Sequence, residues 1–299
     1  MNLAIVLLFQ NEERFLETAL ASIEGQTRRP DRLLLVDDGS SDGSSEIAAS
    51  FAAAHDYARV LTRDAPPPRA DRLAGGAAVI AFQAGVAQLD IDWDIVAKLD
   101  ADIDLNPRTF RTMEHAFVDD PALGVAGPYL STRDHDGRLV RQRGPEYHVE
   151  GPTTFYRRAC FEQISPLPAM LGWDTIDELR ARMRGWKTRS IAIPGGDPVH
   201  LRPMGEHSGY RRSYRRWGEC AYRYGEHPLA VLLIGARRLG DDPPVIGGVN
   251  YVVGWMSAAA RRVPRAEPEL RAYVRRDQMR RIGRRLIGRR TSSDPAPSA

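Results

Sequence analysis

The chain has 299 residues, of which 42% are hydrophobic and 27% are charged, and its formal net charge is only +3. These values indicate a globular protein with one large α/β core, or one core and a smaller appendage, and they exclude a chain that is basic throughout. The two cysteines, Cys160 and Cys220, are isolated, so disulfide staples and zinc sites are not expected and a reducing cytosol is favoured.

The first half of the chain alternates strand and helix patterns. The apolar run Leu3–Phe9 has no basic lead and no cleavage site, so it predicts a first buried strand and not a signal peptide. The helix Glu13–Glu24 follows it. The next predicted elements are strand 32–36, helix 41–54, strand 59–62, helix 74–89 and a strand from residue 95. This order implies βαβ units and a parallel sheet.

The pattern changes after the helix predicted at 108–118, whose start is marked by Pro107 and by Asn106 as a cap. From Gly124 the sequence favours strands, before a helix and one more strand. These elements are strands 124–131, 138–142 and 151–157, helix 174–186 and strand 187–193.

Beyond about residue 203 the sequence predicts helices rich in arginine and aromatic residues. Residues 261–290 contain twelve arginines and only three acids. The segment 269–286 is amphipathic: it can pack on the domain, lie on an anionic membrane or join two subunits, and packing is the expected case. The apolar segments 229–236 and 245–260 fall below the roughly 20 residues of a membrane-spanning helix. Residues 291–299 are predicted to be disordered.

Two acids, Asp100 and Asp102, follow the apolar run of the strand that begins at residue 95. Because side chains alternate along a strand, both point to the same side and can address one divalent cation or the diphosphate that it bridges. Ligands of open α/β sheets bind where the strands end. An Asp-x-Asp also occurs by chance in solvated turns, so the other motifs decide its meaning.

The second predicted strand ends in a run of acids and glycines, VDDGSSDG. Asp37 is the first polar residue after the strand, and we expect it to accept hydrogen bonds from a ribose hydroxyl or a base N–H. Asp42 is assigned to capping the helix that follows.

Three motifs taken together resemble family 2 of the nucleotide-sugar glycosyltransferases. They are LFQNEE at the end of the first strand, VDDGSSDGS after the second and KLDADID after the fourth. The resemblance spans roughly residues 1–203 and implies a GT-A fold, an α/β Rossmann-like, mostly parallel sheet flanked by helices. It implies a nucleotide-binding half of about 1–105 and an acceptor half of about 106–203, with 204–290 as a helical, arginine-rich C-terminal extension.

The resemblance also assigns the donor site. It implies a divalent metal, Mg²⁺ or Mn²⁺, on the diphosphate, held by Asp102 and completed by His200, while Arg202 contacts the diphosphate. The residues that it places around the nucleotide are Asn11, Glu12, Asp37, Asp71, Arg72, Gly75 and Asp100.

A base that deprotonates the acceptor is implied at the start of a helix, about eleven residues before a Gly-aromatic pair. Counting back from Gly185 gives Asp174. Trp173 stands where the family usually has Glu, so Asp177 is kept as the reserve base.

Two further expectations concern the acceptor half. Glu178 is expected to face solvent or to pair with Arg182, four residues on. Gly151 and Pro152 resemble the family's acceptor-side segment, where small residues admit the sugar.

The implied function is that of a metal-dependent glycosyltransferase that moves a sugar from a nucleoside-diphosphate donor to an acceptor hydroxyl, with inversion, in the synthesis of a cell-surface polysaccharide or glycolipid. The expected partners are the donor and a glycan or lipid-linked acceptor, and no nucleic acid. The expected location is the cytoplasm or the inner face of the membrane, with membrane contact or self-association through the extension.

Two alternatives remain. One is a nucleotidyltransferase or other phosphoryl-transfer enzyme, and the other is a non-enzymatic, arginine-rich scaffold. The sequence leaves the donor base, the sugar, the acceptor and the oligomeric state open.

Overall fold

The computed structural model describes residues 1–64, 76–133, 136–142, 144–202, 209–240 and 244–286, and at 284–286 it describes the backbone alone. The chain divides into two compact units, Met1–Met204 and Gly205–Ala299. Each unit has its own hydrophobic core.

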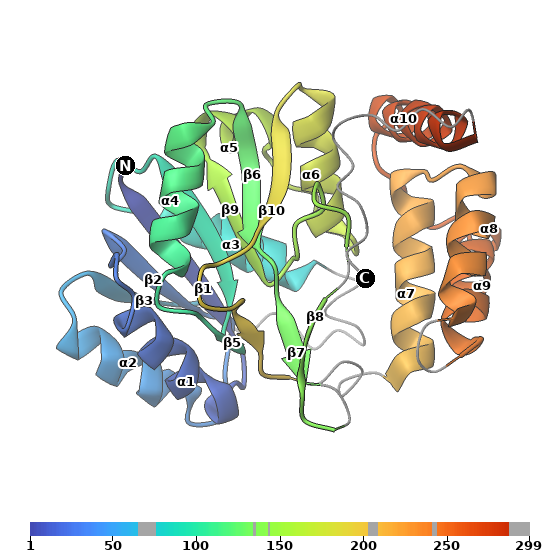
Figure 1. Ribbon diagram of the computed structural model, residues 1–299. Coiled ribbons are helices and arrows are strands. Elements are labelled where there is room, and N and C mark those ends of the chain that lie inside the picture. Colours follow the sequence, from blue (N-terminus) through green and yellow to red (C-terminus); the bar gives the residue numbers. More distant parts are fainter. Residues whose placement is uncertain (65–75, 134–135, 143, 203–208, 241–243, 287–299) are drawn as a thin grey trace. The chain divides into compact units, whose positions relative to one another are not determined.

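Seven strands form the central sheet of the first unit. They are β1 (Leu3–Phe9), β2 (Arg32–Asp37), β3 (Ala58–Thr62), β4 (Ile95–Asp100), β6 (Leu123–Pro128), β9 (Thr153–Arg157) and β10 (Lys187–Ile191). Their order in the sheet is β10-β6-β9-β4-β1-β2-β3 (Figure 1). Strand β9 runs antiparallel to both of its neighbours, and the other pairs are parallel. The expected mostly parallel α/β sheet is therefore confirmed.

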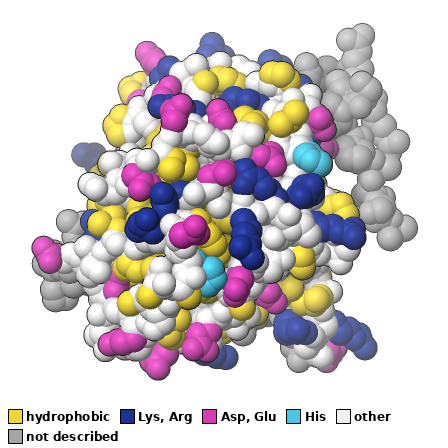
Figure 2. Space-filling view, turned by 90° about the vertical axis from the view of Figure 1, so that its left-hand side faces the viewer, with side chains coloured by type: hydrophobic (Ala, Val, Ile, Leu, Met, Phe, Trp, Pro, Cys, Tyr) yellow, Lys and Arg dark blue, Asp and Glu magenta, His cyan; other side chains and the backbone are white. Residues whose placement is uncertain are grey.

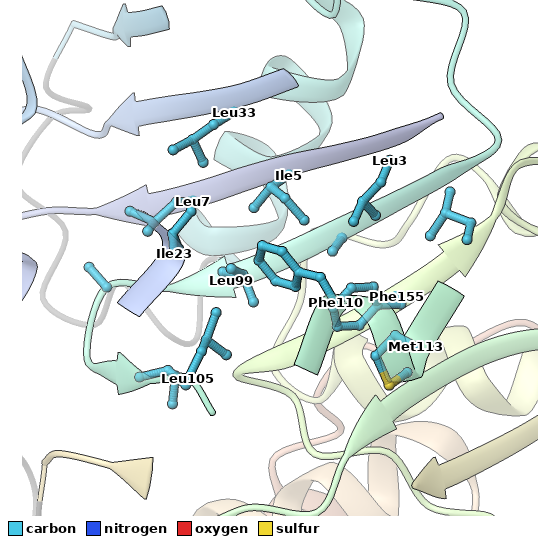
Figure 3. Packing of buried hydrophobic residues seen from close by; sticks show 14 of the residues in the cluster. Leu3, Ile5, Leu7, Ile23, Leu33, Leu99, Leu105, Phe110, Met113 and Phe155 are labelled. Atoms are coloured by element: carbon cyan, nitrogen blue, oxygen red, sulfur yellow. The ribbon is translucent and has the colours of Figure 1, made fainter. Parts of the chain in front are cut away.

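Helices cover both faces of this sheet, because alternate residues of its buried strands point to opposite sides. The helices on the first face are α1 (Glu13–Glu24), α2 (Ser44–Ala54) and α4 (Thr109–Asp119). Figure 3 shows this side of the core, where Leu3, Ile5 and Leu7 of β1 belong to one cluster with Phe110 and Met113 of α4. Burial of these side chains is the main source of stability in this layer.

The helices on the opposite face are α3 (Ala77–Ala87), α5 (Arg158–Ile164) and α6 (Trp173–Met183). Val6 of β1 points into this second core. The Phe82 ring of α3 lies 5.9 Å from the ring of Phe161 and 6.5 Å from that of Trp173, centroid to centroid. These contacts join all three helices, so the start of α6, where the base is expected, is anchored in the core.

A second, four-stranded sheet lies in the same unit. Its strands are β5 (Ile103–Asp104), β7 (Ser131–Arg133), β8 (Leu139–Arg141) and β11 (Val199–His200), in the order β5-β11-β7-β8. In the antiparallel pair β5–β11, His200 lies opposite Ile103. The sequence predicts neither strand of that pair, nor the short helix α5, because two to seven residues give too little periodicity.

The second unit is helical. Its elements are α7 (Gly209–Tyr224), α8 (Pro228–Arg237), the 3₁₀ turn η1 (Arg238–Gly240), α9 (Ile246–Ala260) and α10 (Pro268–Leu286). Helices α7 and α9 pack backbone to backbone at two glycines. A Cβ on Gly218 would collide with the carbonyl oxygen of Tyr251, and one on Gly254 would collide with that of Arg215. Only glycine permits this approach.

The amphipathic helix predicted at 269–286 corresponds to α10. Its residues Leu270 and Val274 are buried, and Gln278 Oε1 accepts a hydrogen bond of 2.9 Å from the backbone N–H of His227. The first part of α10 therefore packs within its own unit, which was the expected case. Within the described ranges, no helix has the length and the apolar content needed to cross a membrane.

Candidate active site

The carboxyl ends of β1, β2 and β4 meet at one edge of the central sheet. Leu8 of β1 pairs with Asp100 of β4, and Phe9 pairs with Asp37 of β2. The sheet therefore brings Asp37 and Asp100 to the same edge. In open α/β sheets this edge binds the ligand.

Asp102, just beyond β4, is buried and belongs to a group of otherwise half-buried charged side chains. Its Oδ2 atom lies 3.2 Å from His200 Nε2 and accepts a hydrogen bond of 3.0 Å from Arg202 Nε. The pairing of β5 with β11 holds this arrangement, and the Leu201 N–H donates to the Asp102 carbonyl at 2.8 Å. The structure thus brings together three residues that the sequence analysis assigned to the metal and the diphosphate.

The guanidinium of Arg202 also reaches Glu12, the third residue after β1 and the N-cap of α1. Its Nη2 atom donates to both carboxylate oxygens of Glu12, at 2.6 and 2.5 Å. Because Arg202 binds Glu12 and Asp102 at once, it joins the ends of β1 and β4. Glu12 therefore lies next to the predicted metal and diphosphate position.

Burial and the neighbouring charges shift the pKa values of Glu12, Asp102 and His200 in different directions. Burial raises the pKa of Glu12 to about 7, although Arg202 opposes the shift. Burial also acts to raise the pKa of Asp102, but His200 and Arg202 outweigh it and lower that pKa to about 2. Burial acts to lower the pKa of His200, and Asp102 raises it overall. Asp102 is therefore ionised at neutral pH, as a metal ligand must be.

The atoms of Asp102 and His200 suit two neighbouring ligands of one divalent cation. A carboxylate oxygen suits Mg²⁺ or Mn²⁺, and a neutral imidazole nitrogen is an accepted ligand of transition metals. Neighbouring ligands of an octahedral ion with bonds of about 2.1 Å lie about 3 Å apart, and the observed separation is 3.2 Å. Among the described residues, no group of three or more His, Cys, Asp and Glu side chains could hold a metal. These two side chains would therefore supply only part of a coordination shell.

Asp100 has different partners from Asp102. Strand β4 ends at Asp100, so the alternation of side chains that would place both acids on one face does not extend to Asp102. The Asp100 Oδ1 atom lies 2.6 Å from Lys98 Nζ, and burial raises the pKa of Asp100 although Lys98 acts to lower it. The two acids are thus held separately, which agrees with separate roles for them.

Lys98 is a buried residue of the site that the sequence analysis did not identify. Its Nζ atom also donates to the Gly151 carbonyl oxygen at 2.9 Å and lies 5.8 Å from the centre of the Trp173 ring. A lysine inside a central strand is unusual, since lysine is rarely fully buried unless it is paired. The position of Lys98 in an otherwise apolar strand is the sequence feature that could have identified it.

Asp174 lies in the first turn of α6, directly beside Gly151. A Cβ added to Gly151 would lie 2.5 Å from Asp174 Oδ2, so the loop backbone touches this carboxylate. Burial raises the pKa of Asp174, while the positive charges of Lys98 and His148 act to lower it. A carboxylate with a raised pKa beside a glycine is suited to act as a general base.

Asp177 is placed differently from Asp174. It is fully buried, accepts a hydrogen bond from the Tyr156 hydroxyl, and burial raises its pKa well above the usual range. Tyr156 belongs to the core between the sheet and α6. Asp177 therefore faces the protein interior and not a space that an acceptor could enter, which corrects its choice as the reserve base.

Glu178 is also buried, so the expectation that it faces solvent is wrong, whereas its expected pairing with Arg182 is confirmed at 3.1 Å. Glu178 Oε1 additionally lies 2.9 Å from His148 Nδ1. Burial acts to lower the pKa of His148, but the charge and the hydrogen bond of Glu178 raise it to about 9. His148 is therefore protonated at neutral pH, and its positive charge acts on Asp174. His148 was not among the predicted site residues, because a single histidine in a loop carries no motif.

Two residues assigned to the nucleoside take part in local hydrogen bonds. Asp37 Oδ1 accepts from the Ser40 N–H at 2.8 Å, and Asn11, which has a positive φ of 56°, accepts from the Ser41 N–H at 2.7 Å. Asp42 was expected to cap the helix that follows, but the N-cap of α2 is Gly43, and Asp42 accepts hydrogen bonds from the N–H groups of Ser44 and Glu13. The assigned residues Asp71, Arg72 and Gly75 lie outside the described residues.

The fold is similar to that of several solved glycosyltransferases. The mannosyltransferase PcManGT of Pyrobaculum calidifontis, solved with GDP-Man and Mn²⁺, has a TM-score of 0.51 and 16% identity, with 97% of this chain and 81% of that chain covered. Residues 1–349 of S. aureus TarS, solved with UDP-GlcNAc, have a TM-score of 0.53 and 17% identity, with 92% and 78% covered. These similarities confirm the GT-A fold.

At the sequence level the chain is similar to an N-acetylglucosaminyl-diphospho-decaprenol L-rhamnosyltransferase of Mycobacterium tuberculosis, known from strains H37Rv and CDC 1551. The two are 31% identical over 195 residues, which is 57% of this chain and 58% of the relative. The chain therefore spans little more than half the length of these curated relatives. The model of glycosyl transferase family 2 matches residues 4–169, more than half of the chain. On this evidence the chain belongs to glycosyl transferase family 2.

Proposed function

We propose that this glycosyltransferase moves a sugar from a nucleoside-diphosphate donor to a hydroxyl of its acceptor, with a divalent cation and with inversion at the anomeric carbon. The observation that carries the proposal is the approach of Asp102, His200 and Arg202 at the carboxyl edge of the sheet. The fold brings these three side chains together from distant parts of the chain. A carboxylate and an imidazole that can bind a cation, next to a guanidinium, suit a metal-bound diphosphate.

On the donor side, Asp102 and His200 would hold the cation, and Arg202 would turn from Glu12 and Asp102 toward the diphosphate. When bound, Mg²⁺ or Mn²⁺ supplies positive charge that offsets the charge of the leaving diphosphate. The residues proposed to surround the nucleoside are Asn11, Glu12, Asp37, Asp71, Arg72, Gly75 and Asp100. Until the donor binds, Glu12 and Asp102 would hold the guanidinium of Arg202 in place.

On the acceptor side, Asp174 would take the proton of the attacking hydroxyl as the oxygen bonds to the anomeric carbon and the bond to the diphosphate breaks. Its raised pKa makes it a stronger base than an exposed aspartate. Gly151 lies directly against this carboxylate, since an added Cβ would be 2.5 Å from Asp174 Oδ2. No covalent sugar intermediate is needed, and inversion follows from a single displacement.

We further propose that the acceptor is lipid-linked and that the enzyme works at the inner face of the membrane, in polysaccharide or glycolipid synthesis. Support comes from the name of the M. tuberculosis relative, which describes transfer to a diphospho-decaprenol. The arginine excess of residues 261–290 agrees with work near anionic lipids.

The test compares Asp102→Asn and Asp174→Asn with Asp119→Asn, an exposed acid at the end of α4. A thermal-shift panel of nucleoside diphosphates with Mn²⁺ first selects the nucleotide. We expect Asp102→Asn to lose both transfer and metal-dependent nucleotide binding, Asp174→Asn to lose transfer alone, and Asp119→Asn to retain both. A fully active Asp174→Asn enzyme would refute the base assignment, and release of phosphate or pyrophosphate without sugar transfer would favour phosphoryl chemistry.

A further inference from the structure

Helices α8 and α9 of the second unit each expose a stripe of large apolar side chains. These six side chains are between 38% and 60% exposed: Leu229, Leu232 and Leu233 on α8, and Val249, Val253 and Met256 on α9. Their spacings, i, i+3, i+4 on α8 and i, i+4, i+7 on α9, place each set on one side of its helix. We call these six residues the α8–α9 stripe.

The α8–α9 stripe is separate from the faces with which these helices form the unit's core. Val231 of α8 and Tyr251 of α9 are buried together in that core. The two helices also meet at Gly235, where an added Cβ would lie 2.6 Å from the Val252 side chain. Single exposed leucines are ordinary, but six on two packed helices form an apolar surface of the kind that marks an interaction site.

The charged side chains that the structure describes within α8 and α9, and directly after α9, are positive. Helix α9 has no charged residue, and α8 has only Arg237, at the end where the chain turns toward α9. Arg262 lies just beyond the far end of α9, and both arginines are exposed. Residues 209–283 contain fifteen arginines and seven acids, of which Asp241 and Asp242 lie in the sequence between η1 and α9. By contrast, basic, acidic and hydrophobic side chains are interspersed on the face of the molecule shown in Figure 2.

We propose that the α8–α9 stripe docks on the surface of an anionic lipid bilayer. The apolar side chains would enter the boundary between headgroups and acyl chains, and the flanking arginines would meet lipid phosphates, with the helices lying in the plane of the membrane. This docking surface deepens the proposed use of a lipid-linked acceptor, on which it rests for its purpose. It differs from the membrane alternative for segment 269–286, because the apolar residues Leu270 and Val274 of α10 are buried.

The test is vesicle flotation of the full chain, with vesicles of phosphatidylcholine alone or with roughly one-third phosphatidylglycerol. Three proteins are compared: the wild type, the double variant Leu232→Glu/Met256→Glu, and the matched control Val118→Glu, whose valine is 57% exposed on α4. We expect wild type and control to float with the anionic vesicles and less so as salt rises, and the double variant to bind at least tenfold more weakly.

Three outcomes would overturn the proposal. One is a wild type that does not bind, and another is a double variant that binds like the wild type. The third is a wild-type dimer that the double variant converts to monomer without a change in vesicle binding, because the stripe would then join two copies. Vesicle binding needs neither donor nor acceptor, whereas the proposed activity is tested by transfer to a detergent-solubilised acceptor. The two experiments therefore distinguish failure of the docking proposal from failure of the proposed activity.

Discussion

Lys98 and Asp100, two residues apart on β4, form an ion pair of 2.6 Å beneath the edge of the sheet where the donor is proposed to bind. The same ammonium group holds the carbonyl oxygen of Gly151, and Gly151 touches the Asp174 carboxylate. One buried lysine thus connects the acid assigned to the ribose with the acid assigned to the acceptor. The donor and acceptor sides of the site share this support.

Replacing Lys98 by Met is expected to impair both stability and turnover. Breaking a buried ion pair costs roughly 3–5 kcal/mol, and because the Asp100 side chain is 34% exposed we expect about 2 kcal/mol. We expect kcat to fall roughly tenfold or more as Gly151 and Asp174 shift. Urea unfolding and steady-state kinetics measure the two effects.

The chain offers a matched control for Lys98→Met. Its only other lysine, Lys187, is 62% exposed and pairs with Asp120 at 2.8 Å. Lys187→Met should leave kcat unchanged and shift stability by less than about 1 kcal/mol. Equal kinetic effects of the two variants would contradict the proposed support role of Lys98.

Gly151→Ala is expected to disturb the base without affecting the nucleotide. The new Cβ would lie 2.5 Å from Asp174 Oδ2, so the carboxylate has to move. We expect kcat to fall roughly tenfold to a hundredfold with unchanged nucleotide affinity. Gly144→Ala is the control in the same loop, because its nearest atom is at an ordinary 3.6 Å. Normal turnover in Gly151→Ala would argue against Asp174 as the base.

Arg202→Gln is expected to weaken nucleoside-diphosphate binding in the presence of Mn²⁺. Loss of charge-assisted hydrogen bonds worth roughly 1.5–3 kcal/mol should raise Kd roughly tenfold to a hundredfold, as calorimetric titration would show. The control is Arg141→Gln, which breaks a comparable two-bond contact with Asp197, of 2.5 and 3.0 Å, away from the sheet edge. An unchanged Kd in Arg202→Gln would remove Arg202 from the diphosphate site.

The pair of His148 with Glu178 predicts how stability depends on pH. The folded-state pKa of His148 is about 9, above its ordinary 6.5, so the pair stabilises the fold fully below pH 6.5 and the contribution is lost as pH rises through 9. Such a shift corresponds to roughly 3 kcal/mol for a fully desolvated group, and since the imidazole is 36% exposed we expect about 1 kcal/mol.

Urea unfolding at pH 6.5 and pH 9 measures this dependence. His148→Gln should lower the unfolding free energy at pH 6.5 and reduce its decrease toward pH 9, whereas His115→Gln, at an exposed position of α4, should behave like the wild type. The same pH dependence in wild type and His148→Gln would show that the pair of His148 with Glu178 does not contribute to stability.

Much of the fold and part of the site follow from local sequence patterns. The apolar runs of β1, β2 and β4 predict buried strands, and β2 and β4 each end in an acid at the edge of the sheet. Asp37 and Asp100 could therefore be placed together before the structure was known. The antiparallel β9 was not predictable, because the direction of a buried strand leaves no trace in its composition.

The sequence by itself determined the α/β class, the strand-end acids and the family motifs, since these depend on periodicity and on residue types within a few positions. Only the tertiary structure decided which distant charges meet. The pairing of β5 with β11 brings His200 and Arg202 to Asp102, and the packing of α6 on the sheet buries Asp177 while leaving Asp174 beside Gly151. Such contacts form only when long loops close and the charged groups become buried together. Because they join residues far apart in the chain, no local sequence pattern encodes them.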